Sequence, residues 1–196
     1  MHKTIDFYNN NYQELLTKYN NANMYELNKI INKFIYKDHY VLDLGFGSGR
    51  DLNYIKNITK NIYGLDGSIE FINNLKKEDI FYKNRVSLSV LPQINTNCFK
   101  INKFDIIISI AVFMHLNKNE ILETIKNMKN KLNHNGKVII SYSTVGRDND
   151  ERDFYEISKD EMTILFNNEN FKEVEFIISK DSLNREIEWI TQVYEL

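Results

Sequence analysis

Hydrophobic positions along the chain alternate between short continuous apolar runs and stretches in which apolar residues recur at helical spacing. The apolar runs, several of them rich in β-branched residues, predict strands at residues 40–44, 61–65, 85–90, 104–110 and 137–142. The helical spacing predicts intervening helices at residues 50–58, 68–75 and 118–132. Because strands that alternate with helices form βαβ units, this order predicts a parallel sheet with helices on both faces.

Both ends of the chain extend this pattern. Apolar residues at helical spacing predict further helices at residues 8–19, 24–35 and 159–168. Near the carboxyl end, apolar runs at residues 174–180 and 187–194 are joined by a short connection that includes residues 181–184, which predicts an antiparallel hairpin. The expected fold class is α/β: a doubly wound, mostly parallel seven-stranded sheet that ends in an antiparallel hairpin.

Composition narrows the class of protein. The 196 residues include 25 Lys and Arg against 27 Asp and Glu, a balance that does not favour binding to nucleic acid. One proline and seven glycines leave no linker, so we expect one domain over residues 1–196. A single cysteine, Cys98, indicates a reducing compartment, and the apolar runs are too short for a membrane span. The first residues lack the apolar core of a signal peptide, so the expected location is cytoplasmic.

The most informative stretch is a glycine-rich turn after the first predicted strand. Asp43 is followed by Gly45, Gly47 and Gly49 at alternate positions, and then by a predicted helix. Glycines allow a sharp turn and let a ligand approach where a Cβ atom would collide. Asp66 ends the second predicted strand, where its carboxylate could accept hydrogens from both hydroxyls of a ribose. Together these features predict a nucleoside site, although a plain tight turn and a helix cap are the alternatives.

This turn and the acid after it resemble those of the class I S-adenosylmethionine-dependent methyltransferases, small-molecule type, and the resemblance covers nearly the whole chain. It implies S-adenosylmethionine as the cofactor, with the glycine turn beneath the methionine half and Asp66 on the ribose. It also implies a Rossmann-like core over residues 37–196 and a helical lid over residues 1–36. A dinucleotide is less compatible, because Arg50 stands where a third glycine would be needed and Asp43 would repel a pyrophosphate.

The expected cofactor contacts follow from this resemblance. They are Tyr12, Asp43, Gly45, Phe46, Gly47, Gly49, Asp66, Gly67, Val90 and Ile110. One of them departs from the family pattern. Members of the family often end the third strand with an acid that meets adenine, whereas this chain has Ser89, Val90 and Leu91 there. A serine hydroxyl or backbone groups near Val90 would have to make that contact.

Several chemistries are disfavoured by what the sequence lacks. At the end of the fourth predicted strand this chain has Ile110, Ala111, Val112 and Phe113, whereas enzymes that align a base amino group have an acid or amide, two prolines and an aromatic residue there. Cys98 precedes that strand, so it is not placed as a nucleophile. Asp105 lies at the wrong end of the strand to hold a magnesium ion near the cofactor. We therefore expect no metal.

Four residues are candidates for the acceptor side of the site. His115 follows the fourth predicted strand and could act as a general base or simply pack. Tyr8 belongs to the aromatic lid, while Arg147 and Arg152 lie on the loop after the fifth strand and suit an anionic group. The expected function is methyl transfer to an oxygen, in preference to a nitrogen, of a small molecule. The alternatives are a non-catalytic cofactor-binding subunit and an RNA or protein methyltransferase; the oligomeric state stays open.

Overall fold

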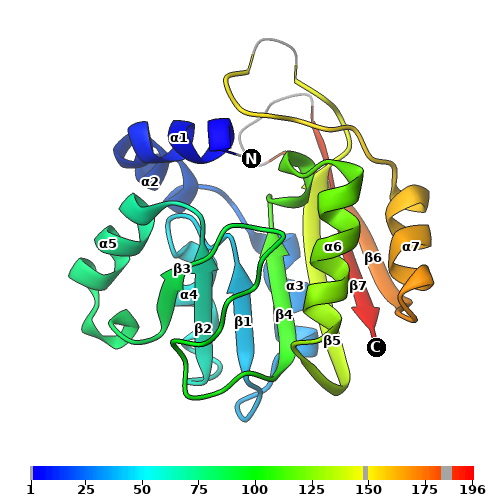
Figure 1. The fold of residues 1–196 in the computed structure, drawn as a ribbon, viewed down its shortest axis with the longest axis horizontal. Coiled ribbons are helices and arrows are strands. Elements are labelled where there is room, and N and C mark those ends of the chain that lie inside the picture. Colours follow the sequence, from blue (N-terminus) through cyan, green and yellow to red (C-terminus); the bar gives the residue numbers. More distant parts are fainter. Residues whose placement is uncertain (1, 148–149, 182–186) are drawn as a thin grey trace.

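A seven-stranded sheet forms the centre of the part of the chain that the computed structural model describes, residues 2–147, 150–181 and 187–196 (Figure 1). The strands are β1 (Val41–Leu44), β2 (Ile62–Asp66), β3 (Val86–Leu88), β4 (Phe104–Ile110), β5 (Leu132–Ser143), β6 (Lys172–Lys180) and β7 (Glu188–Glu195). The α-helices are α1 (His2–Asn10), α2 (Tyr12–Asn20), α3 (Tyr25–Phe34), α4 (Arg50–Ile55), α5 (Ile69–Glu78), α6 (Lys118–Lys129) and α7 (Lys159–Asn168). Short 3₁₀ helices are η1 (Ile80–Tyr82) and η2 (Phe113–His115). Within the described ranges no helix combines the length and apolarity needed to cross a membrane.

The strand order is β3-β2-β1-β4-β5-β7-β6. Strands β1 to β5 pair in parallel, whereas β7 lies antiparallel between β5 and β6. The expected α/β class, with a mostly parallel sheet closed by an antiparallel hairpin, is therefore confirmed. Of the residues expected to connect the hairpin, Ser182, Leu183 and Asn184 lie outside the described residues. Since the order reverses at β1 and β4, the carboxyl ends of these two strands define the crevice where α/β sheets bind ligands.

Apolar residues cover both faces of the sheet. On one face the core includes Ile125 of α6 and Phe166 of α7, both fully buried. On the other it includes Ile31 of α3 and Phe71 of α5. Strand β4 contributes to both clusters, because alternate residues of a strand point to opposite faces. These two packed layers hold the strand ends, and hence the crevice, in a fixed frame.

Two strands, β3 and β5, differ most in length from their sequence-based ranges. β3 ends at Leu88, because the Ser89 hydroxyl donates to the Gln93 carbonyl and accepts the Asn95 N–H, which turns the chain away from the sheet. β5 begins at Leu132, although its polar residues at 133–135 suggest a turn. The pairing of β5 with β4 shifts register between Phe104 and Ile106, which accommodates these extra residues as an irregularity in the ladder.

The aromatic helix expected over residues 8–19 is two helices. The break falls at Asn11, whose backbone N–H and side-chain amide both donate to the Phe7 carbonyl, at 3.0 and 2.9 Å. In Figure 1, α1 and α2 lie beyond the carboxyl ends of β1 and β2. The Ser68 hydroxyl donates to the Asn9 side chain at 2.7 Å and ties α1 to the start of α5. Helix α1 is therefore placed as a cover over the crevice.

Candidate functional site

A cavity of about 800 Å³ lies at the carboxyl ends of β1, β2 and β4, beneath α1 and α2. This volume is in the range typical of small-molecule sites. Ten of the residues singled out in the sequence line it: Tyr8, Gly45, Phe46, Gly47, Asp66, Gly67, Ile110, His115, Arg147 and Arg152. The fold thus brings residues from the glycine turn, the lid and two later loops to one space.

The glycine turn forms the floor of the cavity. A Cβ atom on Gly45 would collide with the Val112 side chain, and the residue has φ +77°, so this glycine is required by the fold. Gly47 has φ +52°, but the nearest atom to a Cβ there is Cδ2 of Tyr19 at 4.0 Å. A side chain on Gly47 would therefore enter the cavity and not the protein core. This open face is what a cofactor lying on the turn requires.

Asp66 stands at the tip of β2 with its carboxylate held by the backbone. Its Oδ2 accepts the Gly47 N–H at 2.8 Å and its Oδ1 accepts the Ser68 N–H at 2.7 Å. Burial raises the pKa of Asp66 to about 6, and these N–H donors oppose that rise. The side chain is thus mostly ionised at neutral pH. Each oxygen keeps a further lone pair, which fits the two hydroxyl hydrogens of a ribose.

The cavity wall, as far as the described residues define it, leaves out four expected cofactor contacts: Tyr12, Asp43, Gly49 and Val90. Tyr12 packs against the same apolar cluster as Tyr8 and Tyr19, and its hydroxyl accepts a hydrogen bond from the Gln13 side chain at 3.3 Å. Ser89 and Leu91 line the cavity on either side of Val90. The Ser89 hydroxyl is already hydrogen-bonded to the backbone of Gln93 and Asn95 in the turn that ends β3.

Asp43 lies beneath the glycine turn, 1% exposed, and not at the cavity wall. Burial, with Asp51 and Asp66 nearby, raises the pKa of this carboxyl well above its usual range. Its Oδ2 has no hydrogen-bond partner among the described residues. The expected electrostatic contact between Asp43 and a cationic amino group therefore has no direct support in this geometry.

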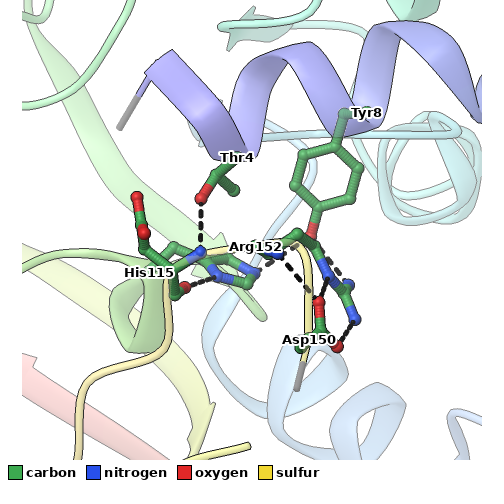
Figure 2. Close-up of polar contacts among 6 residues, drawn as sticks. Thr4, Tyr8, His115, Asp150 and Arg152 are labelled. Carbon is green, nitrogen blue, oxygen red and sulfur yellow. Dashed lines mark hydrogen bonds and ion pairs between the residues drawn. The ribbon is translucent and has the colours of Figure 1, made fainter. Parts of the chain in front are cut away.

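His115 is fixed by hydrogen bonds at both ring nitrogens (Figure 2). Its Nδ1 lies 2.7 Å from the Asp153 carbonyl oxygen, which only accepts, so Nδ1 carries the hydrogen. Nε2 is then the acceptor, and the Tyr8 hydroxyl donates to it at 3.0 Å. Burial lowers the pKa of His115 to about 4, and Arg152 and Arg147 add to this effect, so the ring is neutral at physiological pH.

Arg152 is paired within the protein. It forms two hydrogen bonds with the carboxylate of Asp150, at 2.8 and 2.7 Å, and these lower the pKa of Asp150 to about 2. Its Nη1 also donates to the Tyr8 hydroxyl at 3.4 Å, and its guanidinium lies 4.9 Å from the ring centre of Phe7. The sequence predicted that the Arg152 guanidinium would bind an anionic group of the acceptor. In the structure its charge is already balanced by the Asp150 carboxylate. Arg147 lies over the Phe154 ring at 4.4 Å and also lines the cavity.

Sequence reasoning missed several lining residues. Tyr19 lines the cavity, and burial together with neighbouring Tyr8 raises its pKa. It belongs to the same aromatic stripe as Tyr8, and the spacing along that stripe does not distinguish Tyr19 from Tyr12. Trp189 and Thr191 of β7 line the far end of the cavity, and no local motif marks them. Within the described ranges, no cluster of three His, Cys, Asp or Glu side chains could hold a metal ion.

Comparison with known proteins agrees with this geometry. Residues 42–138 match the family model described as a methyltransferase domain. The chain is 35% identical over 103 residues to the probable S-adenosyl-L-methionine-dependent methyltransferase TehB of Haemophilus influenzae. The aligned residues cover 51% of this chain and 34% of that protein. The match thus spans about a third of the length of that relative.

Solved structures share the fold at low identity. The 1,6-didemethyltoxoflavin-N1-methyltransferase of Burkholderia thailandensis, solved with 1,6-didemethyltoxoflavin and S-adenosylhomocysteine, superposes with a TM-score of 0.74 at 15% identity, covering 99% of this chain and 87% of that one. A putative methyltransferase of Haloferax volcanii, solved with the Trm112 activator, gives 0.70 at 15% identity, covering 88% and 89%. The family match over residues 42–138, the glycine turn and the shared fold together support a class I S-adenosylmethionine-dependent methyltransferase.

Proposed function

We propose that this chain transfers a methyl group from S-adenosylmethionine to an oxygen, in preference to a nitrogen, of a small molecule. The observation that carries the proposal is the pairing of the Asp66 carboxylate with the open face of Gly47 in one cavity. The same cavity continues to Tyr8 and His115, so donor and acceptor would share a single cavity. Residues 1–36 would act as the lid over a core at residues 37–196.

The position of each residue at the cavity wall indicates the role that it would have. Bound S-adenosylmethionine would supply an electrophilic methyl group. Asp66 would orient the ribose, while Gly45, Phe46 and Gly47 would support the methionine half. Helix α1 would exclude water, which strengthens the electrostatic contacts inside the cavity. The chain would act mainly by alignment, with one polar group placed to receive a proton.

Oxygen is preferred because of the uncharged His115 and Tyr8 pair. A hydroxyl group must lose its proton as it is methylated, so it gains most from a neutral imidazole and a phenol at the cavity wall. Nitrogen is kept as the second candidate because the Burkholderia neighbour is, by its name, an N1-methyltransferase. The net charge of -2 offers little support for an RNA acceptor. The alternative function is that of a non-catalytic cofactor-binding subunit in a larger assembly. The Haloferax neighbour, which was solved in a complex with an activator, is the reason to retain it.

The proposal is tested by incubating the purified chain with methyl-labelled S-adenosylmethionine and fractionated pools of small hydroxyl and amine compounds. We expect label in a small-molecule product and one S-adenosylhomocysteine released per methyl group. EDTA should leave the rate unchanged, since the described residues offer no metal cluster. Tight cofactor binding without transfer in any pool would favour the non-catalytic subunit, and loss of activity with EDTA would contradict the metal-free mechanism.

We also propose that the acceptor is anionic and contacts Arg147, which lines the cavity. Arg147→Ala should raise the acceptor KM about tenfold, because a charge-assisted hydrogen bond is worth roughly 1.5–3 kcal/mol. Affinity for S-adenosylhomocysteine, measured by calorimetry, should not change. Arg85→Ala is the matched control, because Arg85 stacks on Tyr63 and Phe81 away from the cavity. Equal KM values for Arg147→Ala and wild type would contradict the anionic contact.

A further inference from the structure

We infer that the Tyr8 hydroxyl, and not the His115 ring, receives the proton of the acceptor hydroxyl, while Tyr8 passes its own proton to Nε2 of His115. This inference rests on the proposed function and assigns the proton path within the same site. The path links α1, which carries Tyr8, to η2, which carries His115 (Figure 2).

The first argument is that His115 has no ring nitrogen left for an acceptor. Nδ1–H is used by the Asp153 carbonyl and the Nε2 lone pair by the Tyr8 hydroxyl. The side chain is also only 2% exposed. An acceptor that approached Nε2 directly would have to displace Tyr8 and break a partly buried hydrogen bond.

The second argument is that the Tyr8 oxygen still has acceptor capacity. A phenolic oxygen donates one hydrogen and has two lone pairs. The hydrogen goes to His115, and one lone pair faces Nη1 of Arg152 at the long distance of 3.4 Å. The ring of Tyr8 is only partly buried and lines the cavity. Tyr8 is therefore the member of the pair that a bound molecule can reach.

The charges around the pair support a proton path of this direction. The guanidinium of Arg152, held by Asp150, stabilises negative charge that develops on the Tyr8 oxygen. The carbonyl of Asp153 stabilises positive charge that develops on the His115 ring. The ring is neutral beforehand, because burial lowers its pKa. Each end of the hydrogen bond thus has a partner for the charge that proton transfer would place there.

The step balances as follows. A lone pair of the acceptor oxygen forms the new bond to the methyl carbon, and the pair of the broken carbon–sulfur bond stays on sulfur. The acceptor O–H bond breaks as its proton moves to the Tyr8 oxygen. The Tyr8 O–H bond breaks as its proton moves to Nε2 of His115, which leaves an imidazolium. That proton returns through Tyr8 to solvent when the product leaves.

The path predicts an unusual pH profile. Among the described residues, the charged and titratable groups facing His115 are Tyr8 from α1 and Arg147, Asp150 and Arg152 from the loop after β5, and Tyr19 of α2 faces Tyr8. Since the pKa of His115 is about 4, the single-turnover rate should show no break near pH 6.5, where an ordinary histidine base titrates. A break near pH 6.5 that His115→Asn removes would mean a histidine with an ordinary pKa and would contradict the path.

The decisive experiment is a double-mutant cycle on the single-turnover methyl-transfer rate. Tyr8→Phe and His115→Asn should each slow transfer roughly 100-fold, and the double variant should be no slower than either, because the two residues act as one unit. The cycle uses the hydroxyl acceptor from the product screen, with phenol and 4-nitrophenol as surrogates. Ionised 4-nitrophenol has no proton to lose, so Tyr8→Phe should slow its methylation far less than that of phenol.

A readout without turnover accompanies these rates. Nitrogen-15 NMR of the S-adenosylhomocysteine complex should show His115 protonated at Nδ1, and Tyr8→Phe should shift its Nε2 signal. Tyr54→Phe is the control, because its hydroxyl bonds Asn32 outside the cavity. Additive losses, or full activity of Tyr8→Phe on the screened acceptor, would overturn the path alone. A wild-type chain that shows this NMR signature but transfers no methyl group would instead overturn the proposed function, and the path with it.

Discussion

Asp66→Ala is expected to weaken binding of S-adenosylhomocysteine by about 10- to 100-fold, the equivalent of roughly 1.5–3 kcal/mol. The carboxylate lines the cavity at the tip of β2, and its loss would leave ribose hydroxyls without a charged acceptor. Isothermal calorimetry measures the change. Asp105→Ala is the matched control, because that carboxylate also accepts a backbone N–H, from Tyr40 at 2.8 Å, but does not line the cavity.

The same carboxylate gives binding a defined pH dependence. The pKa of Asp66 is about 6, so affinity for S-adenosylhomocysteine should fall as pH decreases below 6 and the acid becomes protonated. Stability of the ligand-free protein should respond in the opposite sense. Because the folded-state pKa is raised, the contribution of Asp66 to stability is full below about 4 and is lost as pH rises through 6. An affinity that is flat between pH 5 and 8 would contradict the assignment to ribose.

The sheet was predictable because its strands carry their own signal. The β4 run is β-branched and apolar on both faces, as a strand covered by helices on both sides must be, and the glycine turn follows β1 directly. The split between α1 and α2 was not predictable from spacing, because the apolar positions keep their helical period through Asn11 and the backbone bond from Asn11 to the Phe7 carbonyl is also kept. The same spacing does not show that Tyr8 and Tyr19, and not Tyr12, line the cavity.

The acceptor side of the site was harder to predict than the cofactor side. Gly45, Gly47 and Asp66 sit on tight turns at strand ends, so their sequence positions almost fix their places in space. Arg152 lies on a long loop, where its pairing with Asp150 depends on side-chain conformation. Trp189 reaches the cavity only because β7 inserts between β5 and β6, a pairing that is remote in sequence.

Gly47→Val should abolish measurable cofactor binding and leave the chain folded. A Cβ atom at this position has only the Tyr19 ring near it, at 4.0 Å, so the added side chain would fill the cavity floor where the ligand must lie. The φ of +52° is unfavourable for a branched residue, and we expect a loss of about 1–2 kcal/mol in the free energy of unfolding. Calorimetry with S-adenosylhomocysteine and urea unfolding separate the two effects.

Gly45→Val, two residues earlier in the same turn, is the informative comparison. Its Cβ would collide with Val112 in the protein itself, so this variant should lose far more stability than Gly47→Val. The pair thus distinguishes a glycine that the fold needs from a glycine that the ligand needs. Normal binding by Gly47→Val would move the cofactor off the turn, whereas an unfolded Gly47→Val with a stable Gly45→Val would reverse the two roles. Both glycines lie in one turn and both are replaced by valine. A difference in stability or cofactor binding between the two variants therefore reports on what lies opposite each added Cβ.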